Sequence, residues 1–338
     1  MKIKKLIFIE LNELNFDEIK YYVSKYDLKN FKKLLKFNYR RTLSEKKYNL
    51  LEPWIQWVTI HTGLSAKQHK VFHLGDISKL KKKQIFEIIE SKGFNVGVIS
   101  AMNSINRLKK PKYFIPDPWT KTIPDHSFLS RLITNVLSST IKNNSNLKLN
   151  VTTILKLLYI FFRVVRISQY TYFFYLFLQS IRKKWFKAIF LDYLINEIHL
   201  RYYNKFSPNF STVFFNAAAH IQHHYFLMSK KNSNKKLIPE WYISKKDNPF
   251  KDVVKSYDKM LEYYLNGSKN KFDLILATGL TQTPVKKPIF YWKIKKYDTF
   301  LDFFDIKFNE IRQLMSRDFV IYSRSSQEIK KNFNILNN

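Results

Sequence analysis

The stretch KKLIFIEL, residues 4–11, decides the fold class of this chain because it has the pattern of a buried β-strand. Its apolar run is continuous, rich in strand-forming residues and bounded by charge, as in a strand covered on both faces. Helical periodicity follows it, after a capping Asn15. Three later stretches resemble it and alternate with helical segments, which predicts an α/β domain with a mainly parallel sheet. They are FNVGVIS (94–100), STVFFN (211–216) and FDLILAT (272–278).

Residues 128–208 have a different character, because strand signals vanish and aromatic-rich helical periodicity fills the segment. We therefore predict an α/β core formed by residues 1–127 and 209–338, split by a helical cap insertion at 128–208. Within the second part of this core, RDFVIYS (317–323) is predicted to be an edge strand.

The chain is strongly basic, with 59 Lys and Arg against 26 Asp and Glu and a formal net charge of +33. Such a charge attracts phosphates, anionic lipid headgroups or acidic glycans over long range. The abundance of Lys, Asn, Ile, Phe and Tyr, with only 6 Gly, is also typical of an AT-rich genome, which raises lysine content everywhere. Charge alone therefore does not define a binding face.

The absence of cysteine excludes disulfides, zinc–thiolate sites and thiol catalysis. The first apolar run, Leu6 to Ile9, is shorter than the roughly 7–15 residues of a signal-peptide core. We expect a cytoplasmic protein, with a location peripheral to the inner face of the membrane as a variant of this expectation.

The most apolar part of the insertion is TTILKLLYIFFRVVRISQYTYFFYLFL, residues 152–178. Lys156, Arg163 and Arg166 interrupt it and fall on one helical face with Thr152. Central arginines are costly in a bilayer, which argues against a membrane-spanning helix. Two interpretations stay open: a helical hairpin packed on the core, or an amphipathic element lying on an anionic membrane.

Polar side chains of ligand type follow four of the predicted strands. In open α/β sheets, ligands bind at the carboxyl ends of the strands, so these side chains are expected to share a pocket. They are Glu10, Asn12, Glu13, Ser100, Asn103, Asn216, His220, Thr278, Thr281 and Gln282.

The segment EPWIQWVTIHTGLSAKQH, residues 52–69, resembles the nucleophile-bearing helix of the alkaline phosphatase superfamily, in its phosphodiesterase/nucleotide pyrophosphatase and sulfatase-like branch. The Thr62-Gly63 turn and the downstream His69 carry this likeness. Glu10 stands where the family has an Asp after its first strand. The spacing from Asn216 to His220 is similar to a metal-binding Asp-x-x-x-His pair, and residues 277–280 replace a Ser-Asp-His-Gly turn. The resemblance implies an alkaline-phosphatase-like core.

The chain departs from the family at the reaction centre, because Pro53 falls at the position of the nucleophile. Gln56 falls at the position where the family often has an Asn that binds a phosphate oxygen. The ligands of the family's second metal site are absent. The resemblance therefore implies a site for a single divalent ion, zinc or manganese, and no organic cofactor is expected. Its predicted ligands are Glu10, Asn216 and His220.

His220, His223 and His224 share a face at i, i+3 and i+4 if they lie on a helix, a spacing suited to a metal or a substrate phosphate. The candidate catalytic residues are His220 and His223, together with Gln56, which the resemblance places at a substrate phosphate oxygen.

The first functional hypothesis is a hydrolase or transferase of phosphoryl- or sulfuryl-type groups. Its expected partner is a phosphorylated or sulfated small molecule, an activated sugar or a glycan. The chain is similar to uncharacterised proteins of bacterial surface-polysaccharide assembly, which suggests that context. A second hypothesis is a non-catalytic binding or scaffold protein derived from that fold. A third is a charge-driven binder of anionic membrane surfaces or nucleic acid, although no compact nucleic-acid motif occurs.

Overall fold

The computed structural model describes residues 5–142, 151–229, 231, 235–267, 272–290, 292, 294–313 and 319–337. The chain divides into two compact units. The first comprises Met1–Ile141 and Leu149–Val285, and the second comprises Lys142–Lys148 and Lys286–Asn338.

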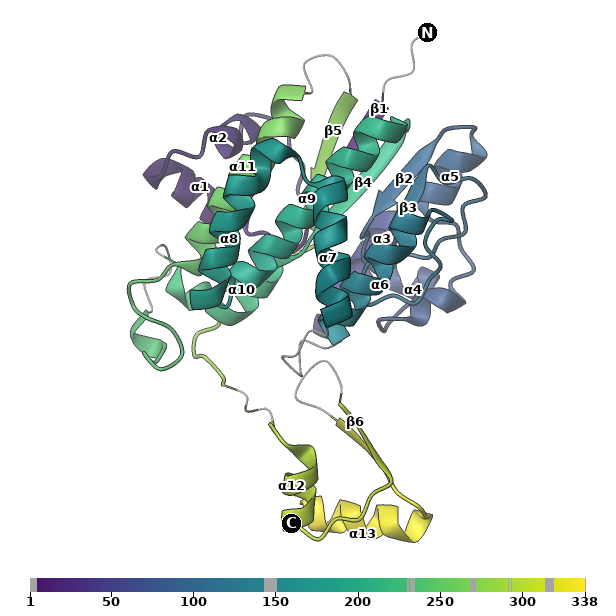
Figure 1. Cartoon of the computed structure of the whole chain (residues 1–338), viewed down its shortest axis with the longest axis vertical. Coiled ribbons are helices and arrows are strands. Elements are labelled where there is room, and N and C mark those ends of the chain that lie inside the picture. The colour runs from purple at the N-terminus through teal and green to yellow at the C-terminus, as the bar shows by residue number, and fades with distance from the viewer. Residues whose placement is uncertain are drawn as a thin grey trace. The chain divides into compact units, whose positions relative to one another are not determined.

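A five-stranded sheet lies at the centre of the first unit, and every strand pair in it is parallel (Figure 1). The prediction of an α/β fold with a parallel sheet is confirmed. The strand order is β3-β2-β4-β1-β5, so β1 lies between β4 and β5. The strands are β1 (Lys5–Leu11), β2 (Val96–Ile99), β3 (Tyr113–Ile115), β4 (Phe210–Phe215) and β5 (Phe272–Ala277).

Helices cover both faces of this sheet, which explains why its strands are continuous apolar runs rather than alternating ones. Those before residue 268 are α1 (Phe16–Lys25), α2 (Lys29–Leu34), α3 (Pro53–Thr62), α4 (Ala66–His69), α5 (Ile85–Ser91), α6 (Phe128–Lys142), α7 (Val151–Val164), α8 (Tyr170–Arg182), α9 (Phe186–Phe206), α10 (Ala217–Tyr225) and α11 (Pro249–Gly267).

The two faces of the sheet have distinct cores. On one face, Trp57 of α3 and Phe86 of α5 pack against Phe8, Val98 and Phe214 of the strands. On the other face, α9 contacts β2 and β4, and α11 contacts α9 (Figure 1). Successive residues of a strand face opposite sides, so odd and even positions of β1 enter different cores.

The segment predicted as an insertion contains α6 to α9. Its described helices belong to the same compact unit as the sheet, and α9 packs directly on β4. Its assignment as a cap stays a prediction. Among the described residues, no helix has the length and apolar character needed to cross a membrane.

The second unit contains α12 (Tyr297–Phe303), β6 (Glu310–Gln313), β7 (Phe319–Tyr322) and α13 (Ser326–Asn337). The strand predicted at 317–323 is described as β7, with residues 317 and 318 outside the described residues. β7 pairs antiparallel with β6 in a separate two-stranded sheet, so it is not an edge of the five-stranded sheet.

A row of three residues across neighbouring strands, with a glycine in the middle, generates the first prediction. Tyr113 and Ser211 are the register partners of Gly97 on its two sides, and the Tyr113 hydroxyl reaches Ser211 Oγ at 2.6 Å. A Cβ at position 97 would lie 2.2 Å from Tyr113 Cζ. Gly97→Ala should therefore destabilise the protein by about 1–3 kcal/mol, through overpacking and a displaced tyrosine. Denaturant unfolding measures this loss.

Gly93→Ala is the control for this substitution, because a Cβ at position 93 meets nothing within 4 Å and only the backbone φ of +84° opposes it. Unchanged stability of the Gly97→Ala protein would show that Tyr113 does not cross over β2 as described.

Candidate functional site

The carboxyl end of β1 is organised by the buried side chain of Asn12. Its Oδ1 accepts a hydrogen bond from Trp57 Nε1 at 2.8 Å, and its Nδ2 donates to Asn216 Oδ1 at 2.8 Å. One amide thus connects β1 with α3 and with the start of α10. The same region contains Gly279, whose Cα approaches the Trp57 ring so closely that a Cβ there would lie 2.8 Å from it.

The next residue, Glu13, turns the chain sharply at this edge. Its φ of +54° is in the left-handed region, which is uncommon for a residue other than glycine. Two hydrogen bonds hold this turn: Glu13 N donates to Thr278 O at 2.8 Å, and Gln222 Nε2 donates to Glu13 O at 2.7 Å. Strained backbone of this kind clusters at functional sites.

The Glu13 side chain joins residues from three strand ends. Its Oε2 accepts from His223 Nε2 at 3.0 Å and from Gln282 Nε2 at 2.6 Å. His223 lies on α10, which follows β4, and Gln282 follows β5. The sequence predicted that polar residues after these strands would lie together, and Glu13 and Gln282 are in contact as expected.

His223 and Glu13 form a carboxylate–imidazole pair with one buried and one accessible partner. The side chain of Glu13 is 6% exposed, whereas that of His223 is 60% exposed. The hydrogen bond to Glu13 raises the pKa of His223, with further contributions from the charges of Glu13 and Glu52. The imidazole therefore holds its proton more firmly than usual and can still reach solvent.

Glu52 is a second carboxylate in the electrostatic environment of this pair. It precedes Pro53 at the start of α3, and its side chain does not cap that helix. Burial raises the pKa of Glu52, the charge of Glu13 raises it further, and His223 lowers it. Sequence reasoning missed Glu52; its place immediately before a helix-initiating proline was the available signal.

His220 and His224 also lie on α10, so the three histidines share one helix as expected from their spacing. The rings of His220 and His224 are 4.7 Å apart, and His224 Nδ1 contacts the Tyr242 hydroxyl at 3.2 Å. Desolvation lowers the pKa of both, and the neighbouring histidines add to it. His220 and His224 are therefore neutral where His223 tends to be charged.

The start of α10 is held by a carboxylate that the sequence did not reveal. Asp192 of α9 accepts from Ala217 N at 2.7 Å and from the Tyr257 hydroxyl at 2.6 Å. Complete burial raises the pKa of Asp192 to about 6. An Asp within a buried helix was the only sequence signal for this role.

Glu10, predicted as a metal ligand, lies fully buried on the α3 side of the sheet. Its Oε2 is 3.2 Å from His61 Nε2, and its Oε1 accepts from the Thr212 hydroxyl. The other predicted ligands are engaged elsewhere: Asn216 Oδ1 accepts from Asn12, and His220 lies beside His224. With these partners, Glu10, Asn216 and His220 do not form one set of metal ligands.

In the part of the chain that the structure describes, no group of three or more His, Asp or Glu side chains has an arrangement that could hold a metal ion. The single zinc or manganese ion stays a prediction from the resemblance.

The remaining residues of the 52–69 segment have local partners. Gln56 is buried and its Nε2 donates to Leu50 O at 2.9 Å. His69 Nδ1 accepts from Val71 N at 3.0 Å, and its Nε2 lies 3.1 Å from Thr59 Oγ1. These contacts engage Gln56 and His69 with the segments that flank α3.

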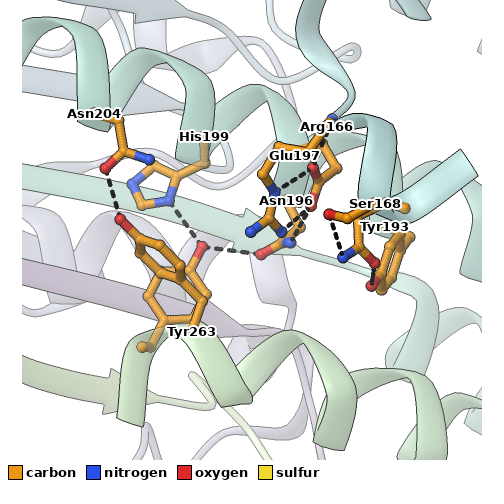
Figure 2. A network of polar contacts seen from close by, with 10 residues as sticks. Arg166, Ser168, Tyr193, Asn196, Glu197, His199, Asn204 and Tyr263 are labelled. Carbon is orange, nitrogen blue, oxygen red and sulfur yellow. Dashed lines mark hydrogen bonds and ion pairs between the residues drawn. The ribbon is translucent and has the colours of Figure 1, made fainter. Parts of the chain in front are cut away.

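A second polar cluster lies between α9, α11 and the end of α7 (Figure 2). The Arg166 guanidinium donates to both oxygens of the buried Glu197, at 2.8 and 2.6 Å. His199 contacts the Tyr264 hydroxyl and Ser211, each at 2.8 Å, and burial lowers the pKa of His199 to about 3.

A cavity of about 260 Å³ opens at this second cluster, lined by Arg166, Gln169, Tyr193, Asn196, Lys259 and Tyr263 among others. Glu197 neutralises the one arginine in it, and His199 is neutral. The Arg166–Glu197 pair therefore fastens the α7–α8 connection to α9.

Comparison with known proteins adds no family: no family model and no curated protein sequence matches this chain.

The pKa order of the histidines is the prediction of this site. His223 should titrate above the ordinary value and His220 below it, in NMR spectra of the protein labelled at histidine and followed over pH. In the Glu13→Gln protein the His223 pKa should fall, because the charged acceptor is lost. The pair stabilises the fold at low pH and loses this contribution as the pH rises through the raised pKa of His223.

Gln282→Leu is a control that removes a neighbour of Glu13 without removing the carboxylate, so His223 should keep a raised pKa. A His223 that titrates at or below His220 would contradict the geometry.

Proposed function

We propose that this chain is a divergent alkaline-phosphatase-like hydrolase or transferase of phosphoryl- or sulfuryl-type groups. Its reaction centre is the carboxyl edge of the sheet. The observation that carries the proposal is the 3.0 Å pair between Glu13 and the solvent-accessible His223. Ligand sites of open α/β sheets lie at this edge, and strained backbone at Glu13 marks it here.

His223 acts as the proton donor in this proposal. The hydrogen bond to Glu13 raises the pKa of His223 and so favours its cationic form, which can donate its proton to the leaving-group oxygen as the bond from phosphorus or sulfur to that oxygen breaks. Glu13 orients the imidazole and balances its charge.

Glu52 is the proton acceptor. As the oxygen of water or of an acceptor hydroxyl bonds to phosphorus or sulfur, its proton passes to the Glu52 carboxylate, whose raised pKa makes it a stronger base than an ordinary glutamate. His220, which lies on α10 together with His223 and is neutral, supplies a ring N–H to a substrate oxygen. No metal is assigned a part in these steps.

The substrate is an anion in this account. A net charge of +33 attracts anionic molecules over long range. A phosphorylated or sulfated small molecule, an activated sugar or a glycan fits this charge, and the resemblance suggests surface-polysaccharide assembly in a bacterium. The proposed location is the cytoplasm.

A non-catalytic binding protein is the second candidate, and the position of Pro53 favours it. Pro53 begins α3 where the resembled family has its nucleophile, and the Gln56 amide donates to Leu50 O. In this case the same edge binds the anion without turning it over.

Enzyme assays of variants distinguish the hydrolase or transferase from the non-catalytic binding protein. Purified protein is assayed with p-nitrophenyl phosphate, bis-p-nitrophenyl phosphate and p-nitrophenyl sulfate across pH 5–9. His223→Asn should lower kcat/KM at least roughly a hundredfold, the usual contribution of a general acid. Glu13→Gln should shift the alkaline limb of the pH profile to lower pH, because the acid then loses its proton more easily.

His224→Asn is the matched control, since it removes a neighbouring imidazole on the same helix that lies outside the proposed pair, and it should retain activity. Equal activity of His223→Asn and wild type would contradict the proposed acid. Anion binding without turnover by the wild type would establish the second candidate.

A further inference from the structure

Helix α7 presents an apolar arc to solvent. Its exposed large side chains recur at i, i+3, i+4, i+7 and i+11, the spacing of one helical face. They are Val151, Ile154, Leu155, Leu158 and Phe162, and Phe162 is 64% exposed. A helix that only packed on a core would turn this arc inward.

Helix α8 repeats the arrangement. Phe174, Phe177, Leu178 and Ile181 stand at i, i+3, i+4 and i+7, and Phe174 is 64% exposed. The exposed arcs of α7 and α8 are together named the α7–α8 face. Large apolar side chains exposed at this spacing on two successive helices are typical of an interaction site.

The orientation of both helices is fixed by their other sides. Ile160 and Val164 of α7, and Phe173 and Leu176 of α8, are buried. Both helices contact α9, and Phe173 packs edge-on against Phe190 of that helix. The Arg166–Glu197 pair holds the connection between them (Figure 2). The exposed arcs therefore cannot rotate inward without breaking these contacts.

The sequence that contains both helices is basic. It has no acidic residue between Asp125 and Asp192 but ten basic ones: Arg131, Lys142, Lys148, Lys156, Arg163, Arg166, Arg182, Lys183, Lys184 and Lys187. Two of the ten are paired with acids from elsewhere in the chain, Arg166 with Glu197 and Lys183 with Asp247. On α7, Lys156 and Arg163 are exposed and seven residues apart, so they share the side of the helix beside the arc. Arg182 and Lys184 are exposed at the end of α8.

We propose that the α7–α8 face docks on an anionic lipid bilayer. The apolar side chains enter the boundary between headgroups and acyl chains, while Lys156, Arg163, Arg182 and Lys184 lie at the level of the lipid phosphates. Charge complementarity selects this occupant, because a second copy of the chain would place cationic helices against each other. The proposal uses helices outside the Glu13–His223 site, so the two stand or fail separately.

The test is co-sedimentation of the full chain with vesicles of phosphatidylcholine, alone or mixed with phosphatidylglycerol. Wild type should bind the mixed vesicles far more tightly than the neutral ones, and salt should weaken binding. Phe162→Asn combined with Phe174→Asn should lower the partition coefficient at least tenfold, roughly the least expected from the lost apolar insertion. Lys156→Gln with Arg163→Gln should weaken binding to the mixed vesicles only.

The chain offers matched controls. Phe333→Asn removes a phenylalanine of equal exposure, 64%, from α13, and Lys330→Gln with Lys331→Gln removes two exposed charges from the same helix. All variants should unfold at the wild-type temperature, since the changed side chains are exposed.

Binding that the control variants lose as strongly as the α7–α8 variants would overturn the proposal, because it would then reflect net charge alone. Absence of wild-type binding to the mixed vesicles would overturn it too. So would a concentration-dependent dimer, seen by sedimentation velocity, that the paired Phe→Asn change abolishes while vesicle binding persists.

Discussion

The arrangement of the candidate site depends on one buried amide, that of Asn12. It satisfies the indole N–H of Trp57 on one side of the sheet and the amide oxygen of Asn216 on the other. An unpaired buried donor costs about 1–3 kcal/mol, so these three residues have strong reason to stay together. Asn12 thereby connects the end of β1 to α3 and α10, and the turn at the next residue, Glu13, is held by Thr278 and Gln222. His223 pairs with Glu13 at this edge, and the charge of Glu52, which precedes α3, acts on the same pair.

Strand geometry explains why two glutamates three residues apart have different environments. Glu10 belongs to β1, and the alternation of the strand sends it into the core beneath α3, where His61 and Thr212 contact it. Glu13 follows the strand and faces the carboxyl edge. The resemblance to alkaline phosphatases predicts a role for Glu10, whereas the carboxylate–imidazole pair that reaches solvent is formed by Glu13 and His223.

Local pattern was sufficient to predict the sheet, because continuous apolar runs between helices define parallel strands. It also identified Glu13, Asn216 and the histidines as strand-end residues. It could not give their pairings, since partners such as Glu13 and His223 are more than two hundred residues apart in sequence. Arg166 illustrates the same limit: helical periodicity grouped it with Lys156 and Arg163, but a buried Glu197 binds it and separates its role from theirs. The isolation of β7 from the main sheet depends on pairing with β6, which local strand propensity does not encode.

A double-mutant cycle between Asn12 and Trp57 tests the central claim most directly. Free energies of unfolding are measured for wild type, Asn12→Ala, Trp57→Phe and the double variant. If the amide joins these elements, the costs of the single changes are not additive, and the double variant is more stable than their sum predicts by about 0.5–3 kcal/mol. Additive costs would contradict the account, because Asn12 would then not connect β1 to α3.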